Sequence, residues 1–301
     1  MNERRSFFDE IARNKLKSTA LLFLFSGVII ALGYVLGLIW FPQWPFAGMF
    51  LAFFIGVIYM AFAWVGGDKI ILSTSRARPV KKEEDPYLVN TVEAMAIAAG
   101  LSKPPRVYII NETSMNAFAT GRDPNHAVIA VTSGLRKRMN RLELEGVIAH
   151  EMSHIKNYDI RVMMLATVLL GIVVLISDLL LRSFLYGGSG RDRKNNTVFL
   201  LVGLALAILA PIIAQLLRLA ISRKREFLAD ATAVQLTRNP SGLASALKKI
   251  RDDHDKVVDI ANKATAHLYI ENPLRHKKSW LNNLFSTHPD INERIARLEA
   301  M

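Results

Sequence analysis

Two long stretches without a charged residue dominate the N-terminal part of the chain. They are Ser18–Phe41 and Phe46–Val65, and each, as a helix, is long enough to cross the roughly 30 Å hydrocarbon core of a bilayer. Trp40 and Trp44 lie at the junction between them, beside two prolines, which is typical of a tight turn at the membrane interface. We therefore expect residues 1–65 to form a basic N-terminal segment followed by a transmembrane hairpin.

The composition agrees with a membrane protein. The chain is 51% hydrophobic, and its 38 Lys and Arg against 26 Asp and Glu give a formal charge of +12, which is typical of basic flanks facing the cytoplasm. Because the basic residues lie beside apolar segments and not in an aromatic-studded patch, we expect no nucleic-acid partner. There is no cysteine, so any metal ion must bind to His, Asp or Glu.

A second pair of apolar stretches follows later in the chain. Residues 162–181 are apolar except for Asp178, and residues 197–217 carry no charge. We interpret 162–217 as a second transmembrane hairpin, which gives about four transmembrane helices. Asp178 weakens the first of these spans, and the four basic residues in the loop 182–196 conflict with placing that loop outside.

The segment between the hairpins predicts a helix and a small sheet. Gly66-Gly67 are expected to end the first hairpin, and the polar residues 73–85 to form a linker. Helical spacing then predicts a helix over Pro86–Ala99, closed by Gly100. Three strands are expected after it, at 106–110, 116–121 and 127–132, with a turn at 123–125 between the last two. The edge of this sheet either accepts an extended peptide as an added strand or belongs to an ordinary structural hairpin.

The segment Arg141–Asn157 carries the strongest chemical motif. His150 and His154 are four residues apart, so on a helix both imidazoles point to one face and can bind a single ion. Glu151 lies next to the first histidine, where it can act as general base on a water molecule. The alternative is two histidines without a metal, but the apolar residues before His150 indicate a buried helix, where such histidines are unfavourable.

A catalytic zinc ion keeps three protein ligands, so the two histidines need a partner. Residues 218–237 read as a helix on which Glu226 and Asp230 lie one turn apart, with Glu226 as a candidate third ligand. Asp230 can accept a hydrogen bond from a ligand histidine and so select its tautomer. By spacing alone, a solvated pair of acids is the stronger interpretation, and other carboxylates such as Asp159 compete for the ligand role.

Four motifs in this order resemble the HtpX family of membrane zinc metalloproteases, which are gluzincins related to the CAAX prenyl proteases. The resemblance covers nearly the whole chain. Its motifs are Asn116-Ala117-Phe118, His150-Glu151-Met152-Ser153-His154, Glu226-Phe227-Leu228-Ala229-Asp230 and Thr287-His288-Pro289.

The resemblance implies one Zn²⁺ per chain, bound by His150, His154 and Glu226, with Glu151 as the catalytic base. It also implies that Asp230 supports a ligand histidine from behind. Three further residues are implied in binding substrate or stabilising the oxyanion, namely Asn116, His288 and Arg294.

The expected fold is α+β, mainly α-helical, with a gluzincin-like protease domain divided into residues 66–161 and 218–301. The two metal-binding segments flank the second hairpin, so they meet only if the chain returns to the same membrane face. With a basic N-terminus inside, we expect a bacterial-type plasma (inner) membrane protein whose catalytic domain and both termini are cytoplasmic. Residues 252–283 are compatible with a lid, a partner surface or a plain loop.

The expected activity is that of a zinc metalloendopeptidase acting on protein or peptide substrates, with misfolded or damaged membrane proteins implied by the resemblance. A CAAX-type processing protease is the first alternative, and it is disfavoured because those enzymes have more membrane spans. A non-catalytic membrane scaffold or chaperone is the second. It is disfavoured because a purely structural metal site has no use for the base Glu151.

Overall fold

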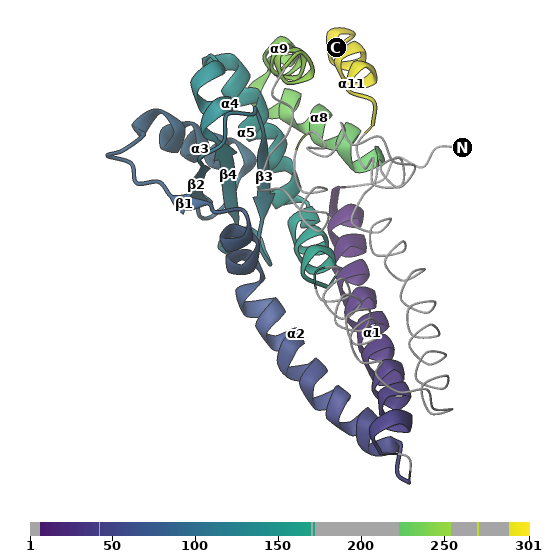
Figure 1. Cartoon of the computed structure of the whole chain (residues 1–301). Helices are drawn as coiled ribbons and strands as arrows, with labels where there is room; N and C mark the ends of the chain where they lie inside the picture. Colours follow the sequence, from purple (N-terminus) through teal and green to yellow (C-terminus); the bar gives the residue numbers. More distant parts are fainter. Residues whose placement is uncertain (1–6, 42, 170, 172–222, 254–269, 271–288) are drawn as a thin grey trace, which may run out of the picture.

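The computed structural model describes residues 7–41, 43–169, 171, 223–253, 270 and 289–301. Two long helices, α1 (Phe7–Trp40) and α2 (Phe46–Thr74), extend side by side away from a part that contains the sheet and the shorter helices (Figure 1). Both long helices are long and apolar enough to cross a membrane, which agrees with the predicted first hairpin. Among the described residues, they are the only two helices of that kind.

The two long helices pack closely at glycines near the turn that joins them. A Cβ atom on Gly33 would lie 2.6 Å from the carbonyl oxygen of Gly48, so only glycine allows this approach. The outer face of α2 is strongly apolar, and Phe50, Phe54 and Phe62 are 59%, 61% and 67% exposed. A face of this kind is unfavourable in water and is suited to contact with lipid.

The prediction that Gly66-Gly67 end α2 is wrong, because the helix continues to Thr74. The second glycine allows the side chain of Met164 to pack against the helix, since a Cβ on Gly67 would be 3.1 Å from its sulfur atom. Beyond the glycines, Ile71 and Leu72 are buried in a core shared with the sheet. This tertiary packing outweighs the low helix propensity of glycine, which makes a helix less stable than alanine does by roughly 1 kcal/mol per residue.

The sheet has four strands in the order β1-β2-β4-β3. Strands β2 (Arg106–Ile110), β3 (Ala117–Thr120) and β4 (Val128–Thr132) confirm the three predicted strands, and the short 3₁₀ helix Pro124–His126 forms the predicted turn. β2 and β4 are parallel, whereas β3 is antiparallel to β4 and lies at one edge of the sheet. The sequence did not predict β1 (Arg78–Pro79), because two residues are too short for a periodic pattern.

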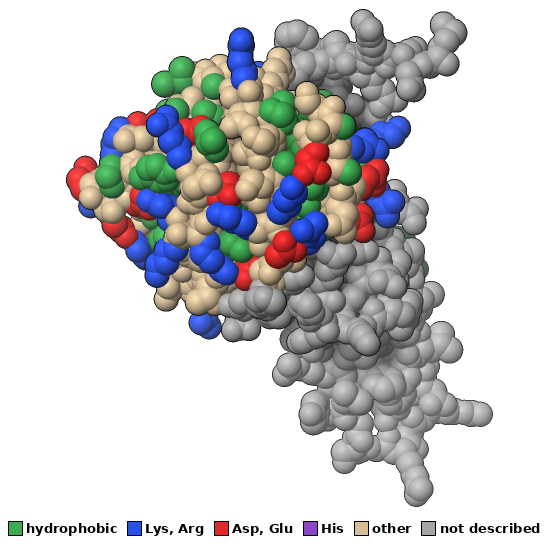
Figure 2. Space-filling view, turned by 90° about the horizontal axis from the view of Figure 1, so that it is seen from above, with side chains coloured by type: hydrophobic (Ala, Val, Ile, Leu, Met, Phe, Trp, Pro, Cys, Tyr) green, Lys and Arg blue, Asp and Glu red, His purple; other side chains and the backbone are tan. Residues whose placement is uncertain are grey.

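Short helices surround a central one, α5 (Arg141–Lys156), which contacts α3, α8, α9 and β3. α3 (Pro86–Ala99) confirms the prediction, including Gly100 as its left-handed C-cap with φ of 73°. The remaining helices are α4 (Ser133–Arg138), α8 (Arg223–Thr237), α9 (Pro240–Arg251) and α11 (Ile291–Glu299). On the face seen in Figure 2, basic and acidic side chains are interspersed, as expected of a surface in water.

The structure is therefore mostly helical with a small mixed sheet, as predicted. Most of the second predicted hairpin lies outside the described residues, apart from residues 162–169, which are helical and largely buried. The four predicted transmembrane helices and the domain boundaries at 65, 161 and 217 stay predictions. Residues 252–283 also lie largely outside the described part.

Candidate metal centre

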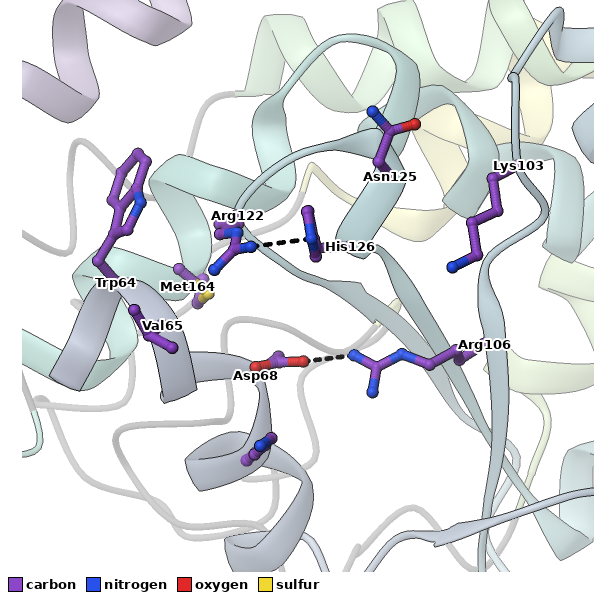
Figure 3. A pocket seen from close by; sticks show the side chains of 10 residues that line it. Trp64, Val65, Asp68, Lys103, Arg106, Arg122, Asn125, His126 and Met164 are labelled. Carbon is purple, nitrogen blue, oxygen red and sulfur yellow. Dashed lines mark hydrogen bonds and ion pairs between the residues drawn. The ribbon is translucent and has the colours of Figure 1, made fainter. Parts of the chain in front are cut away.

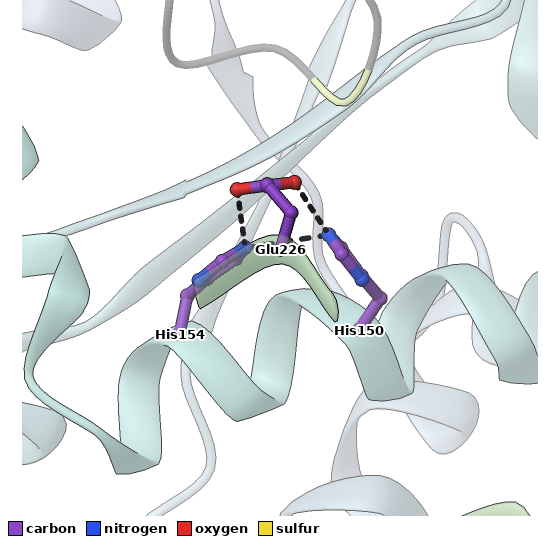
Figure 4. A group of neighbouring side chains, drawn as sticks. All are labelled: His150, His154 and Glu226. Atoms are coloured by element: carbon purple, nitrogen blue, oxygen red, sulfur yellow. Dashed lines mark hydrogen bonds and ion pairs between the residues drawn. The ribbon is translucent and has the colours of Figure 1, made fainter. Parts of the chain in front are cut away.

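Helix α5 holds the two motif histidines and the intervening glutamate inside the protein. Its N-terminus is fixed by a capping box, in which Asn140 and Glu143 exchange side chain–backbone hydrogen bonds. His150, Glu151 and His154 are 1%, 2% and 4% exposed. The imidazole rings of His150 and His154 lie on the same face of the helix with their centroids 4.9 Å apart (Figure 4).

Glu226 of α8 places its carboxylate opposite these two rings (Figure 4). Its oxygens lie 3.7 Å from Nε2 of His150 and 3.6 Å from Nε2 of His154. The two Nε2 atoms are 3.3 Å apart, and all three potential ligand atoms lie within 4.8 Å of one another. Ligand atoms roughly 2.1 Å from a tetrahedral centre lie about 3.4 Å from each other, so the spacing of this cluster fits a zinc ion.

The Nδ1 atom of His150 faces a buried ion pair. It lies 3.0 Å from Oδ1 of Asp230, and Arg294 donates to both oxygens of Asp230 at 2.7 and 2.9 Å. Burial alone would raise the pKa of Asp230, but the charge of Arg294 and the hydrogen bonds lower it to about 2. Asp230 is therefore a firm acceptor that keeps the Nδ1 proton of His150 in place and leaves Nε2 to face Glu226.

Burial and hydrogen bonding also act in opposite directions on the pKa of His150. Burial lowers the pKa of His150, but the hydrogen bonds to Asp230 and Glu226 outweigh it and raise the pKa to about 9. This environment favours a positive charge on the imidazole, or a cation beside it.

The Nδ1 atom of His154 faces a different carboxylate, Asp159, at 3.0 Å. Asp159 accepts a hydrogen bond from Nδ2 of Asn14 at 2.8 Å and lies 3.3 Å from the guanidinium of Arg225. Asn14 also donates to the carbonyl oxygen of Asn157 at 2.9 Å and is 1% exposed, so helix α1 contacts the support of the second histidine. Asp159, considered as a competing ligand, thus lies on the opposite side of the His154 ring from Glu226.

Of the other predicted site residues, one lies in the cluster, one lies next to the edge strand and one lies outside the described residues. Asn116 is buried directly before the edge strand β3, where its backbone N–H donates to Thr132 Oγ1 at 2.9 Å. The edge is occupied at its first residue, because the carbonyl of Ala117 accepts a hydrogen bond from the N–H of Ile270 at 3.0 Å. Arg294 is 1% exposed and lies in the cluster around His150. His288 lies outside the described residues.

Sequence reasoning missed Asn14 and Arg225 as parts of this cluster. Arg225 directly precedes Glu226, so its presence next to the site could have been inferred from that adjacency. Asn14 had no local signal, because its partner Asp159 is 145 residues further along the chain.

The chain is similar to known proteins over most of its length. The model of "Peptidase family M48" matches residues 82–301. A "Protease HtpX homolog" of Dictyoglomus thermophilum is 46% identical over 98% of this chain and 95% of its own length. Similar proteins of the same description from Caldanaerobacter subterraneus subsp. tengcongensis and Lactobacillus helveticus are 45% and 42% identical, and the matches cover 99% and 98% of this chain and 99% of each relative.

Among solved structures, the comparison finds the crystal structure of S. mikatae Ste24p. It has a TM-score of 0.49 and 18% sequence identity, and the match covers 97% of this chain and 67% of that one. The predicted resemblance to the HtpX proteases is confirmed by the sequence relatives, which match over nearly their whole length. On the strength of the family match and of these relatives, the chain belongs to peptidase family M48 and is a membrane metalloprotease of the HtpX type.

Proposed function

We propose that the chain hydrolyses peptide bonds with the aid of one zinc ion bound by His150, His154 and Glu226. The observation that carries this proposal is the convergence of three ligand atoms in a buried cluster, with a carboxylate behind each histidine. Three protein ligands leave a fourth position for water or substrate, as in catalytic zinc sites. Carboxylates at both Nδ1 atoms are the usual way in which ligand histidines are oriented.

His150, His154 and Glu226 would hold the zinc ion, which when bound would supply the Lewis acidity that lowers the pKa of water towards roughly 7 and polarises a carbonyl group. Glu151 is buried one residue after His150, on the same helix as both histidines. We assign it the proton transfers: its carboxylate takes the proton of the attacking water and delivers it to the leaving amine. Asp230 and Asp159 keep the proton of each histidine on Nδ1 throughout.

The remaining site residues take supporting roles in this proposal. Arg294 forms a bidentate pair with Asp230, which favours a role in holding that carboxylate over direct contact with substrate. A contribution of Arg294 to the oxyanion stays a prediction, as do the substrate-binding roles of Asn116 and His288. Asn116 directly precedes the edge strand β3, and because Ile270 already occupies that edge at Ala117, an extended peptide would be added along Phe118–Thr120.

The substrates proposed are misfolded or damaged membrane proteins of a bacterial-type plasma membrane. Helices α1 and α2 lead directly from the membrane region to the part that contains the site, which favours substrates that emerge from the bilayer (Figure 1). Because basic flanking segments tend to stay on the cytoplasmic side, the basic N-terminal segment places the catalytic part and both termini in the cytoplasm in this proposal. The full-length relatives are HtpX proteases, which favours this function over CAAX processing.

The proposal is tested with full-length protein purified in detergent. We expect about one zinc per chain and cleavage of casein that stops with a chelator and returns when zinc is added. Glu151→Gln should retain zinc but lose activity by about 10²- to 10⁴-fold, the usual contribution of general acid–base catalysis. Glu145→Gln is the matched control, because Glu145 lies on the same helix and pairs only with Arg141 among the interactions described. Full activity of Glu151→Gln, or cleavage that survives the chelator, would refute the proposal.

A further inference from the structure

A polar cavity lies where the end of α2 meets the sheet, and it is separate from the metal centre (Figure 3). Its volume is about 370 Å³, within the range of small-ligand sites. Four parts of the chain line it: the last part of α2, the start of β2 with the residues before it, the loop between β3 and β4, and Met164. None of its lining residues belongs to the proposed zinc site, so the cavity needs a separate explanation.

The cavity is lined by more basic than acidic side chains. Four cationic residues face it, against the single carboxylate of Asp68, and they are Lys69, Lys103, Arg106 and Arg122. Asp68 is neutralised by Arg106 at 2.5 Å. Lys69 and Lys103 make no ion pair or hydrogen bond with any part of the chain that the structure describes. The cavity is therefore left with a positive charge that an anionic ligand would neutralise.

Arg122 is held in place at the cavity wall. Its guanidinium donates to Nε2 of His126 at 2.8 Å (Figure 3). Nδ1 of His126 lies 2.8 Å from Asp123. The guanidinium of Arg122 also lies 3.6 Å from the carboxylate of Asp123. Arg122 is only 26% exposed, so its position is determined by the fold and not by solvent.

The length of α2 and the position of its first charged residue indicate the depth of the cavity relative to the bilayer. This helix has 29 residues and is about 44 Å long, whereas the hydrocarbon core is roughly 30 Å thick. Its uncharged stretch ends at Gly67, directly before Asp68. Trp64, whose ring lies 5.1 Å from the guanidinium of Arg161, is a typical interfacial residue. With α2 in the bilayer, the turn that carries Asp68 and Lys69 would lie at the level of the lipid headgroups.

We propose that this cavity binds the phosphate group of an anionic phospholipid. Lys69 and Lys103 would contact the phosphate, while Val65, which lines the cavity and is 64% exposed, continues into the apolar face of α2 where an acyl chain can lie. Basic pockets beside membrane helices are the usual sites for such headgroups. The proposal rests on α2 lying in the bilayer and is independent of zinc.

The test measures lipid retention by the full-length protein with native mass spectrometry after reconstitution with phosphatidylglycerol, phosphatidylcholine or a mixture of both. We expect preferential retention of phosphatidylglycerol, and a loss of about tenfold in that preference for the double variant Lys69→Gln/Lys103→Gln. The matched control is Lys81→Gln/Lys137→Gln, which removes the same charge from two exposed lysines outside the cavity. Zinc content should be the same in all three proteins.

Two results would overturn the proposal. The first is an equal loss in both double variants, which would show that net charge alone attracts the lipid. The second is complete displacement of phosphatidylglycerol by millimolar inorganic phosphate, which would assign the cavity to a soluble phosphate compound. Retained zinc with lost lipid preference separates this inference from the proposed catalytic function.

Discussion

The two motif histidines are equivalent in the sequence, yet the structure supports them in different ways. His150 faces Asp230, which is fixed by two hydrogen bonds from Arg294, and both partners come from the C-terminal helices α8 and α11. His154 faces Asp159, which is shared between Arg225 of α8 and Asn14 of α1. One half of the cluster is thus held within the protease part, and the other half is joined to a membrane helix.

This difference predicts that substitutions around His150 and substitutions around His154 have different effects. Asp230 and Arg294 form a buried charge pair, so the loss of either removes the nearest counter-charge of a buried group. Asp159 has a neutral amide as its closest support and a guanidinium at 3.3 Å, so its surroundings are less dependent on a single partner. The variants below follow from this comparison, in order of the expected effect.

The largest effect is expected from Glu226→Ala, which removes the only group that faces both histidines in the described cluster. Two histidines alone do not complete a three-ligand zinc site, so most of the zinc should be lost on dialysis and activity should fall with it. Zinc per chain is measured by atomic emission, with Glu299→Ala, an exposed partner of Lys248, as the control. Unchanged zinc content would remove Glu226 from the ligand set.

Arg294→Ala tests the His150 half. It should destabilise the protein by about 3–5 kcal/mol, because Asp230 would remain buried without its counter-charge. Chemical unfolding monitored by tryptophan fluorescence measures this loss. Arg297→Ala on the same helix, where the side chain is 54% exposed and pairs with Glu293, should change stability by less than about 1 kcal/mol. A stability close to that of the unaltered chain would contradict the buried pair.

Asp230→Asn and Asp159→Asn compare the two halves directly. Each should weaken zinc binding by about 10- to 100-fold, since each removes the charged acceptor behind a ligand histidine. We expect Asp230→Asn to be the more destabilising of the two, because it also removes the carboxylate that Arg294 contacts at 2.7 and 2.9 Å, whereas Glu226 lies 3.8 Å away. Competition with a zinc chelator gives the affinities. Equal effects on both affinity and stability would show that the two halves are not different.

The smallest effect is expected from Asn14→Leu, which removes the hydrogen bonds from α1 to Asp159 and to the carbonyl of Asn157. Because Asn14 acts through Asp159, zinc affinity should fall by less than about tenfold. Ser18→Ala is the control, because Ser18 is similarly buried on α1 but, among the described residues, donates only to the backbone of Asn14. Identical affinity in Asn14→Leu and Ser18→Ala would show that α1 does not contribute to the metal site.

Local patterns predicted much of the fold because their physical causes are local. The limits of α3 follow from a helical stripe with Pro86 at its start and Gly100 after its end, and the structure confirms both. The same kind of rule failed at Gly66-Gly67, because packing of Met164 against Gly67 and burial of Ile71 keep α2 helical to Thr74. A glycine pair predicts a helix end only where no tertiary contact holds the helix together.

The candidate site shows the same division between local and distant causes. The sequence by itself determined that His150 and His154 lie on one face of a helix, with Glu151 beside them, because the 3.6-residue period places side chains four apart on the same face. Only the tertiary structure decided that Glu226 faces the Nε2 atoms while Asp159 and Asp230 lie behind the rings. Helix periodicity orients side chains within one segment, whereas the meeting of segments such as α1 and α5 depends on how their surfaces pack.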